Sequence, residues 1–76
     1  MYKLSQVPLD SDCVIQEVKE EGVGLRLMEM GLIPGTPVRR ILNAPGGCPL
    51  AVLVGDSYVL GLRREEAELV TVYFTT

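Results

Sequence analysis

The side chains of this chain best suited to nucleophilic or metal-binding chemistry are two cysteines, Cys13 and Cys48. The sequence contains no histidine, which is the commonest general base and metal ligand near neutral pH. Cys48 follows Gly46-Gly47, but a phosphate-binding loop needs Lys and Ser or Thr after its glycines. No C-x-x-C pair supports a metal site that joins the cysteines to Asp10 and Asp12. The sequence therefore predicts no catalytic residue, no bound cofactor and no structural metal ion.

One charged motif, Arg63-Arg64-Glu65-Glu66, has two interpretations. Its opposite charges are typical of a surface turn whose side chains neutralise one another. In the second interpretation, an arginine is offered to a phosphate held by a partner, as an arginine finger. The sequence favours the surface turn.

Length and charge restrict the class of protein. The 76 residues are expected to form a single domain over positions 1–76, and 47% of them are hydrophobic. A net charge of −3 argues against a nucleic-acid partner, because phosphate binding needs a clustered basic surface. The longest apolar run, Leu50 to Val54, is far shorter than the roughly 18 residues of a membrane span, so no direct membrane insertion is expected.

The N-terminal residues Met1 to Gln6 have neither the basic region nor the apolar run of a secretory signal. We therefore expect a cytoplasmic protein. Because that compartment keeps thiols reduced, Cys13 and Cys48 are interpreted as two free thiols.

Short elements must position these residues. Alternating or continuous apolar runs predict five strands, at 13–18, 38–43, 50–54, 57–62 and 69–74. A helix is expected over Val23 to Met30, and Gly55-Asp56 is expected to be a two-residue hairpin loop. In the first strand both faces carry apolar residues, so the buried face stays ambiguous. The predicted fold is mainly β: a small antiparallel barrel of five strands with one short helix between strands one and two.

The residues that follow the helix predict a sharp change of direction. Gly31 lies where the helix must end, a position that commonly takes a positive φ, and Leu32 can then fold back on Leu27. Pro34-Gly35 fits the central pair of a type II turn, since proline presets the first φ and glycine accepts the positive second one. Gly31, Pro34 and Gly35 are therefore interpreted as structural turn residues.

The two faces of the helix suggest different roles. The residues expected to face the core are Val23, Leu27 and Met30. Leu25 and Met28 lie on the other side beside Glu29, and we expect these three residues to bind a partner, because methionine suits adaptable surfaces. The alternative is that Leu25 and Met28 pack against the N-terminal segment around Tyr2 and Leu4.

Three segments carry a resemblance to a known family: Arg26 to Thr36, Ala44 to Pro49, and Leu60 to Val72. With these segments in this order and spacing, nearly the whole chain resembles FeoA, the small cytoplasmic accessory protein of bacterial ferrous iron uptake. It is also similar to the SH3-like C-terminal domain of DtxR-type iron-dependent repressors. The FeoA family usually has Gly-Asp-Pro where this chain has Gly47-Cys48-Pro49, so no role of a carboxylate carries over to that loop.

The resemblance implies an SH3-like barrel, a place in iron homeostasis, and a partner: the membrane transporter FeoB, typically through its cytoplasmic GTPase domain. It implies no catalytic residue. Two alternatives stay open: a ligand-sensing or transition-metal-sensing regulatory domain like that of the repressors, and a GTPase-stimulating protein that uses Arg63 or Arg64. The absence of histidine reduces the support for the metal-sensing alternative.

Overall fold

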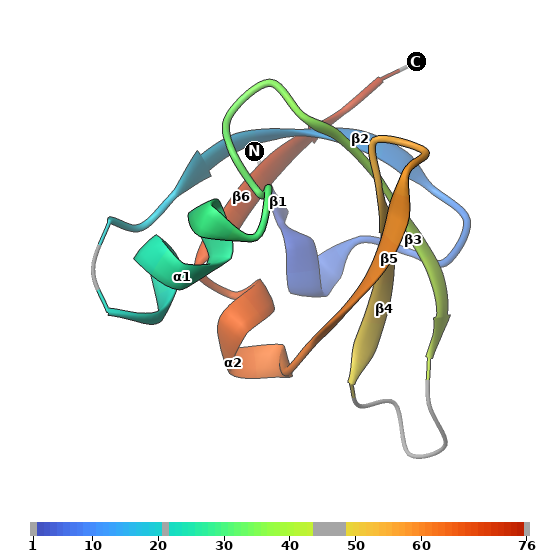
Figure 1. The fold of residues 1–76 in the computed structure, drawn as a ribbon. Helices are drawn as coiled ribbons and strands as arrows, with labels where there is room; N and C mark the ends of the chain where they lie inside the picture. The colour runs from blue at the N-terminus through green and yellow to red at the C-terminus, as the bar shows by residue number, and fades with distance from the viewer. Residues whose placement is uncertain (1, 21, 44–48, 76) are drawn as a thin grey trace.

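The computed structural model describes residues 2–20, 22–43 and 49–75 (Figure 1). The elements in chain order are β1 (Tyr2–Lys3), the 3-10 helix η1 (Leu4–Gln6), β2 (Asp12–Val18), α1 (Val23–Glu29), β3 (Pro37–Asn43), β4 (Leu50–Val54), β5 (Tyr58–Leu62), α2 (Arg64–Ala67) and β6 (Val70–Phe74). None of the helices in the described part has the length and apolar character needed to cross a bilayer.

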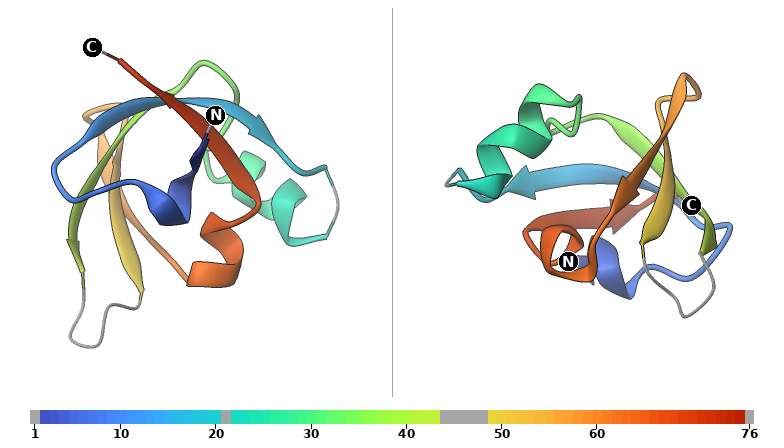
Figure 2. Two further views of the ribbon diagram at one scale, coloured as in Figure 1. Left: turned by 180° about the vertical axis from the view of Figure 1, so that it is seen from behind. Right: turned by 60° about the horizontal axis from the view of Figure 1, so that its bottom comes forward.

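The strands form a six-stranded antiparallel sheet in the order β1-β6-β2-β3-β4-β5. The sheet bends strongly around the core, with α1 on one flank and the β4–β5 hairpin on the other (Figures 1 and 2). The mainly-β antiparallel class with a short helix between β2 and β3 is confirmed. Two details differ from expectation: there are six strands, and the described sheet is not closed, since β1 and β5 are its two edges.

The additional strand is β1, which pairs with β6 through Tyr2↔Val72 and Lys3↔Thr71. Two residues are too few to show an alternating pattern, so this strand is defined by its pairing and not by its sequence. The ring of Tyr2 lies edge-on to that of Phe74, with centroids 4.9 Å apart, so an aromatic contact adds to the short ladder.

A bulge in β2 explains why its buried face was ambiguous. The pairing of β2 with β6 shifts register between Ile15 and Glu17. One extra residue moves every later side chain to the opposite face. Cys13 and Ile15 therefore point into the core before the bulge, and Val18 does so after it.

Among the described residues, the buried core is aliphatic apart from the Cys13 thiol and draws on every strand from β2 to β6. Its buried residues are Leu4, Val7, Cys13, Ile15, Val18, Leu27, Leu32, Val38, Leu50, Val52, Val54, Leu62, Ala67, Val70 and Val72. Leu4 and Val7 come from η1 and its end, so the N-terminal segment fills the interior beneath the sheet. This packing leaves α1 to cover only one side of the core (Figure 2).

The loop of the β4–β5 hairpin is one residue longer than expected. Val54 pairs with Tyr58, so three residues connect the strands and Ser57 lies outside β5. Gly55 and Asp56 both have positive φ, 54° and 59°, and the Ser57 N–H donates to the Val54 carbonyl at 2.9 Å. A tight turn therefore forms at the expected dipeptide, but the expected two-residue loop is wrong.

Candidate docking surface

The C-terminal end of α1 is closed by hydrogen bonds to backbone carbonyls. The Gly31 N–H donates to the Met28 carbonyl at 3.0 Å, and the Leu32 N–H donates to the Leu27 carbonyl at 3.1 Å. Gly31 has a φ of 103°, as expected for the residue after the cap of such a helix end. Leu27 and Leu32 are both buried in the core. The helix end is therefore fixed by backbone geometry and by a hydrophobic contact together.

The chain then passes through a second turn that is anchored on β2. The Thr36 N–H donates to the Ile33 carbonyl at 3.1 Å, and Gly35 has a φ of 90°, which is the pattern of a type II turn around Pro34-Gly35. The Gly35 N–H also donates to the Ile15 carbonyl at 2.8 Å. These bonds leave little freedom in the direction of α1.

A contact with β5 that the sequence does not reveal adds a third constraint. The Tyr58 hydroxyl donates a hydrogen bond to the carbonyl of Met30, the C-cap residue of α1. A Cβ placed on Gly31 would lie 2.0 Å from the Tyr58 hydroxyl oxygen. Glycine at this position thus serves the turn and also admits the tyrosine.

The N-terminal end of α1 lies directly on backbone. Gly24 is buried, and a Cβ added there would lie 1.7 Å from the Lys19 carbonyl oxygen. No side chain can replace that glycine without moving the helix. Fixed at Gly24 and at Gly31, α1 is a rigid platform for the residues on its outer side.

The prediction that three residues of α1 face the core is wrong for two of them. Leu27 is buried, but Val23 is 38% exposed and Met30 is 41% exposed. The helix instead turns Gly24, Leu27 and Met28 inward, at spacings of three and four residues. Gly24 has no apolar side chain, so a count of apolar residues could not identify it as the point of closest contact.

The three residues expected to bind a partner lie in different environments. Leu25 is 48% exposed and Glu29 is exposed, one turn apart on the outer side of α1. Met28 is partly buried and packs against the core, so it forms the inner margin of this surface. Because about half of Leu25 is exposed, this side chain is not buried against the N-terminal segment around Tyr2 and Leu4. We refer to Leu25, Met28 and Glu29 as the α1 surface.

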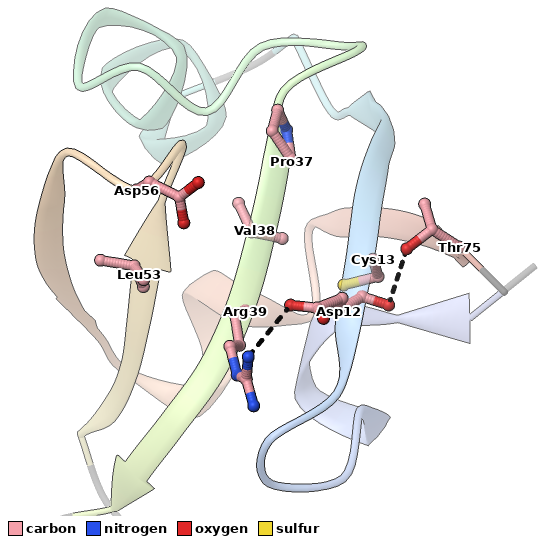
Figure 3. A pocket seen from close by; sticks show the side chains of 8 residues that line it. All are labelled: Asp12, Cys13, Pro37, Val38, Arg39, Leu53, Asp56 and Thr75. Atoms are coloured by element: carbon pink, nitrogen blue, oxygen red, sulfur yellow. Dashed lines mark hydrogen bonds and ion pairs between the residues drawn. The ribbon is translucent and has the colours of Figure 1, made fainter.

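A shallow cavity of about 370 Å³ lies elsewhere, across β2, β3 and the β4–β5 hairpin (Figure 3). At its wall the Arg39 guanidinium lies 3.8 Å from an Asp12 carboxylate oxygen, an exposed pair that contributes little to stability. Burial, and then the Asp12 carboxylate, raise the pKa of the Cys13 thiol to about 11. The thiol is therefore protonated near neutral pH and is a poor nucleophile.

The remaining sequence candidates have structural roles or lie outside the described residues. Arg63 is the N-cap residue of α2, and its backbone N–H donates to a Glu66 carboxylate oxygen at 2.7 Å. This local contact agrees with the interpretation as a surface turn. Within residues 2–20, 22–43 and 49–75, no three His, Cys, Asp or Glu side chains come together as metal ligands. Gly46, Gly47 and Cys48 lie outside the described residues.

A bent antiparallel sheet and one helix held at both ends define a small β domain with an exposed helix surface. Comparison with protein-family models agrees with this class. The FeoA domain matches residues 2–73, so the chain belongs to the FeoA family. The family ties it to ferrous iron transport as a non-catalytic accessory domain.

Solved structures of FeoA proteins have the same fold. The chain is 35% identical to FeoA from Stenotrophomonas maltophilia, with a TM-score of 0.85 over 96% of this chain and 91% of that one. That protein was crystallised with zinc and is described as a prokaryotic SH3 domain protein, hypothesised to be a ferrous iron transport activating factor. FeoA from Chlorobium tepidum is 32% identical, with a TM-score of 0.85 over 97% of this chain and 70% of that one.

More distant comparisons add the fold alone. IdeR from T. acidophilum is 21% identical, with a TM-score of 0.80 over 96% of this chain and 33% of that one. This likeness shows a shared fold and not a shared regulatory role. The comparison with curated proteins found no match.

Proposed function

We propose that this protein is a cytoplasmic accessory protein of bacterial ferrous iron uptake that binds the transporter FeoB through the α1 surface. Binding modulates the assembly of the transporter or its GTPase-linked transport. Membership of the FeoA family supports the place in iron uptake. The observation that carries the docking role is Leu25, a large apolar side chain that is 48% exposed on a helix fixed at both ends.

A rigid helix lowers the entropy lost on binding, because its exposed side chains already have a defined direction. Leu25 would enter an apolar pocket of the partner, and Glu29, one turn further along, would lie at the polar rim. Met28 contributes its exposed part at the inner margin, where its flexible thioether adapts to the partner's shape.

Calorimetric titration of the FeoB cytoplasmic domain, with and without guanine nucleotide, tests this proposal. Leu25→Ser is expected to weaken binding by at least about tenfold, as for a central apolar contact, while its unfolding free energy stays within about 0.5 kcal/mol of wild type. Leu9→Ser is the matched control, because Leu9 is also a leucine and is 47% exposed, against 48% for Leu25. Equal affinity of the two variants for the FeoB domain would exclude the α1 surface as the docking site.

Measuring the rate of GTP hydrolysis by the FeoB domain as this protein is added separates docking from stimulation. If this protein only docks, it binds FeoB and alters GTP turnover by FeoB only by favouring one nucleotide-bound state of that partner. An arginine supplied to the nucleotide would instead raise turnover by orders of magnitude and lose that effect in Arg63→Ala or Arg64→Ala.

A further inference from the structure

The shallow cavity of about 370 Å³ across β2, β3 and the β4–β5 hairpin combines an apolar base with charged groups (Figure 3). The base is apolar because Pro37, Val38 and Leu53 line it. Val38 is 3% exposed, so the base belongs to the packed core and has a fixed shape. A mainly apolar lining with a few charged groups at defined positions is typical of small-molecule sites. None of the three residues of the α1 surface is among the described residues that line this cavity.

Three charged side chains line the cavity, and each comes from a different element. Asp12 begins β2, Arg39 lies in β3, and Asp56 lies in the turn between β4 and β5. The carboxylates of Asp12 and Asp56 point into the cavity from opposite sides, with Val38 between them (Figure 3). Arg39 Nη1 lies 3.8 Å from Asp12 Oδ1, which is too long for a hydrogen bond. Each of the three groups therefore keeps hydrogen-bonding capacity for a ligand.

We propose that this cavity binds a free basic α-amino acid of the lysine type. The charges of such a ligand are the opposites of those in the cavity: a carboxylate for Arg39, an α-ammonium for Asp12 and a side-chain cation for Asp56. The α-ammonium and the carboxylate are attached to one carbon, and Asp12 and Arg39 likewise lie beside each other. A guanidinium can hold the carboxylate through two parallel hydrogen bonds.

Other ligand classes leave one of these charges unmatched. A simple cation places a like charge against Arg39, and a simple anion faces two carboxylates. A neutral amino acid offers no cation to Asp56. A lysine residue inside a polypeptide lacks both the α-ammonium and the α-carboxylate, so the ligand is the free amino acid.

The spacing of the strands fits the length of this ligand. Cys13 pairs with Val38, and Val38 pairs with Val54, so β2 and β4 are two strand spacings apart, about 10 Å. The two amino nitrogens of an extended lysine are about 7 Å apart, and a hydrogen bond adds about 2.8 Å at each end. One lysine molecule therefore spans the distance between the strands while its methylene groups cover the apolar base.

An NMR titration of the full isotope-labelled chain with L-lysine tests the proposal without any transporter. We expect saturable shift changes that are largest at the amides of residues 12–14, 38–39 and 53–57. The Kd is expected between about 0.1 and 10 mM, because the side chains of Asp12 and Arg39 are 62% and 45% exposed and water weakens their charge interactions.

A pair of matched variants locates the side-chain cation of the ligand. Asp56→Asn is expected to raise the Kd for L-lysine by at least about fivefold, because it removes the negative charge at that end of the cavity. Asp10→Asn is the control, since Asp10 is also an exposed aspartate with a positive φ, 62° against 59° for Asp56, and is not among the described lining residues. Asparagine tolerates a positive φ, so both variants are expected to keep their turns.

Ligands of altered charge and length test the remaining contacts at about pH 6, where their amino groups are protonated. L-Lysinamide lacks the carboxylate and is expected to bind at least about fivefold more weakly than L-lysine, and Arg39→Gln should remove that difference. General attraction to a chain with a net charge of −3 would instead favour the amide, which carries more positive charge. L-2,4-Diaminobutyrate has the charges of lysine but is two methylene groups shorter, so it should also bind at least about fivefold more weakly.

Three outcomes would overturn the proposal. The absence of a saturable shift change at about 50 mM L-lysine would exclude the site. Binding of L-lysinamide that equals or exceeds that of L-lysine would show attraction by net charge alone. Equal effects of Asp56→Asn and Asp10→Asn on the Kd would place the ligand outside this cavity.

Discussion

The contact between Gly31 and Tyr58 leads to a quantitative prediction for Gly31→Ala. A side chain at a φ of 103° costs on the order of 1 kcal/mol in backbone strain. The added methyl would also lie 2.0 Å from the Tyr58 hydroxyl oxygen, so the ring must move and release the Met30 carbonyl. Loss of that exposed hydrogen bond adds about 0.5–1 kcal/mol. We therefore expect Gly31→Ala to lower the free energy of unfolding by about 2 kcal/mol in total.

Gly35→Ala is the matched control for this prediction. Gly35 also has a positive φ, 90°, but a Cβ added there meets nothing within 4 Å, so only the backbone strain of about 1 kcal/mol applies. Tyr58→Phe removes the hydroxyl, and the nearest ring carbon lies at an ordinary 3.4 Å from the added Cβ. In the Tyr58→Phe background, Gly31→Ala should therefore cost only about 1 kcal/mol.

Urea denaturation of the wild type, Gly31→Ala, Tyr58→Phe and the double variant gives the required double-mutant cycle, provided that the m-values agree. The predicted coupling between Gly31→Ala and Tyr58→Phe is about 1 kcal/mol. Equal costs for Gly31→Ala and Gly35→Ala, or a cost for Gly31→Ala that does not change in the Tyr58→Phe background, would refute the role assigned to the tyrosine.

Three further predictions follow from burial. Gly24→Ala should cost at least about 3 kcal/mol in urea denaturation, because the added Cβ meets the Lys19 carbonyl oxygen at 1.7 Å. Gly22→Ala, whose added Cβ meets nothing within 4 Å but whose φ is 51°, should cost only the backbone strain of about 1 kcal/mol, and equal costs for the two variants would contradict the prediction. Leu27→Ala should cost about 2–5 kcal/mol, since Leu27 is 1% exposed, whereas Leu25→Ala should stay within about 0.5 kcal/mol. The Cys13 thiol has a pKa raised from 9.0 to about 11, so its contribution to stability is present below pH 9 and is lost as the pH rises through about 11. Cys13→Ala should lack this component, and identical pH dependence of the two proteins would show that the folded thiol is not shifted.

The parts of this fold that local residues determine could be predicted from the sequence. Gly31 follows a short apolar helix, and Pro34-Gly35 follows at turn spacing, so the change from helix to strand is encoded within a few residues. The bulge in β2 could not be predicted, because an extra residue is defined only by the partner strand β6.

The candidate site was predicted less completely for the same reason. Leu25 and Glu29 lie on the exposed side of α1, as the sequence suggests, but Val23 and Met30 do not face the core. The helix was oriented by the close approach of Gly24 to backbone, which is a tertiary effect that a helical wheel of apolar residues omits. The Tyr58 contact joins residues 28 positions apart and has no local signal.

The most direct test of the central claim is an NMR titration of isotope-labelled protein with the FeoB cytoplasmic domain. Docking through the α1 surface predicts saturable shift changes that are largest from Leu25 to Met30. Leu25→Ser should move these changes to at least about tenfold higher concentrations of the FeoB domain, and Leu9→Ser should leave them intact. No saturable change, or changes confined to strands away from α1, would contradict the claim that this FeoA-family domain acts by binding the transporter through its helix.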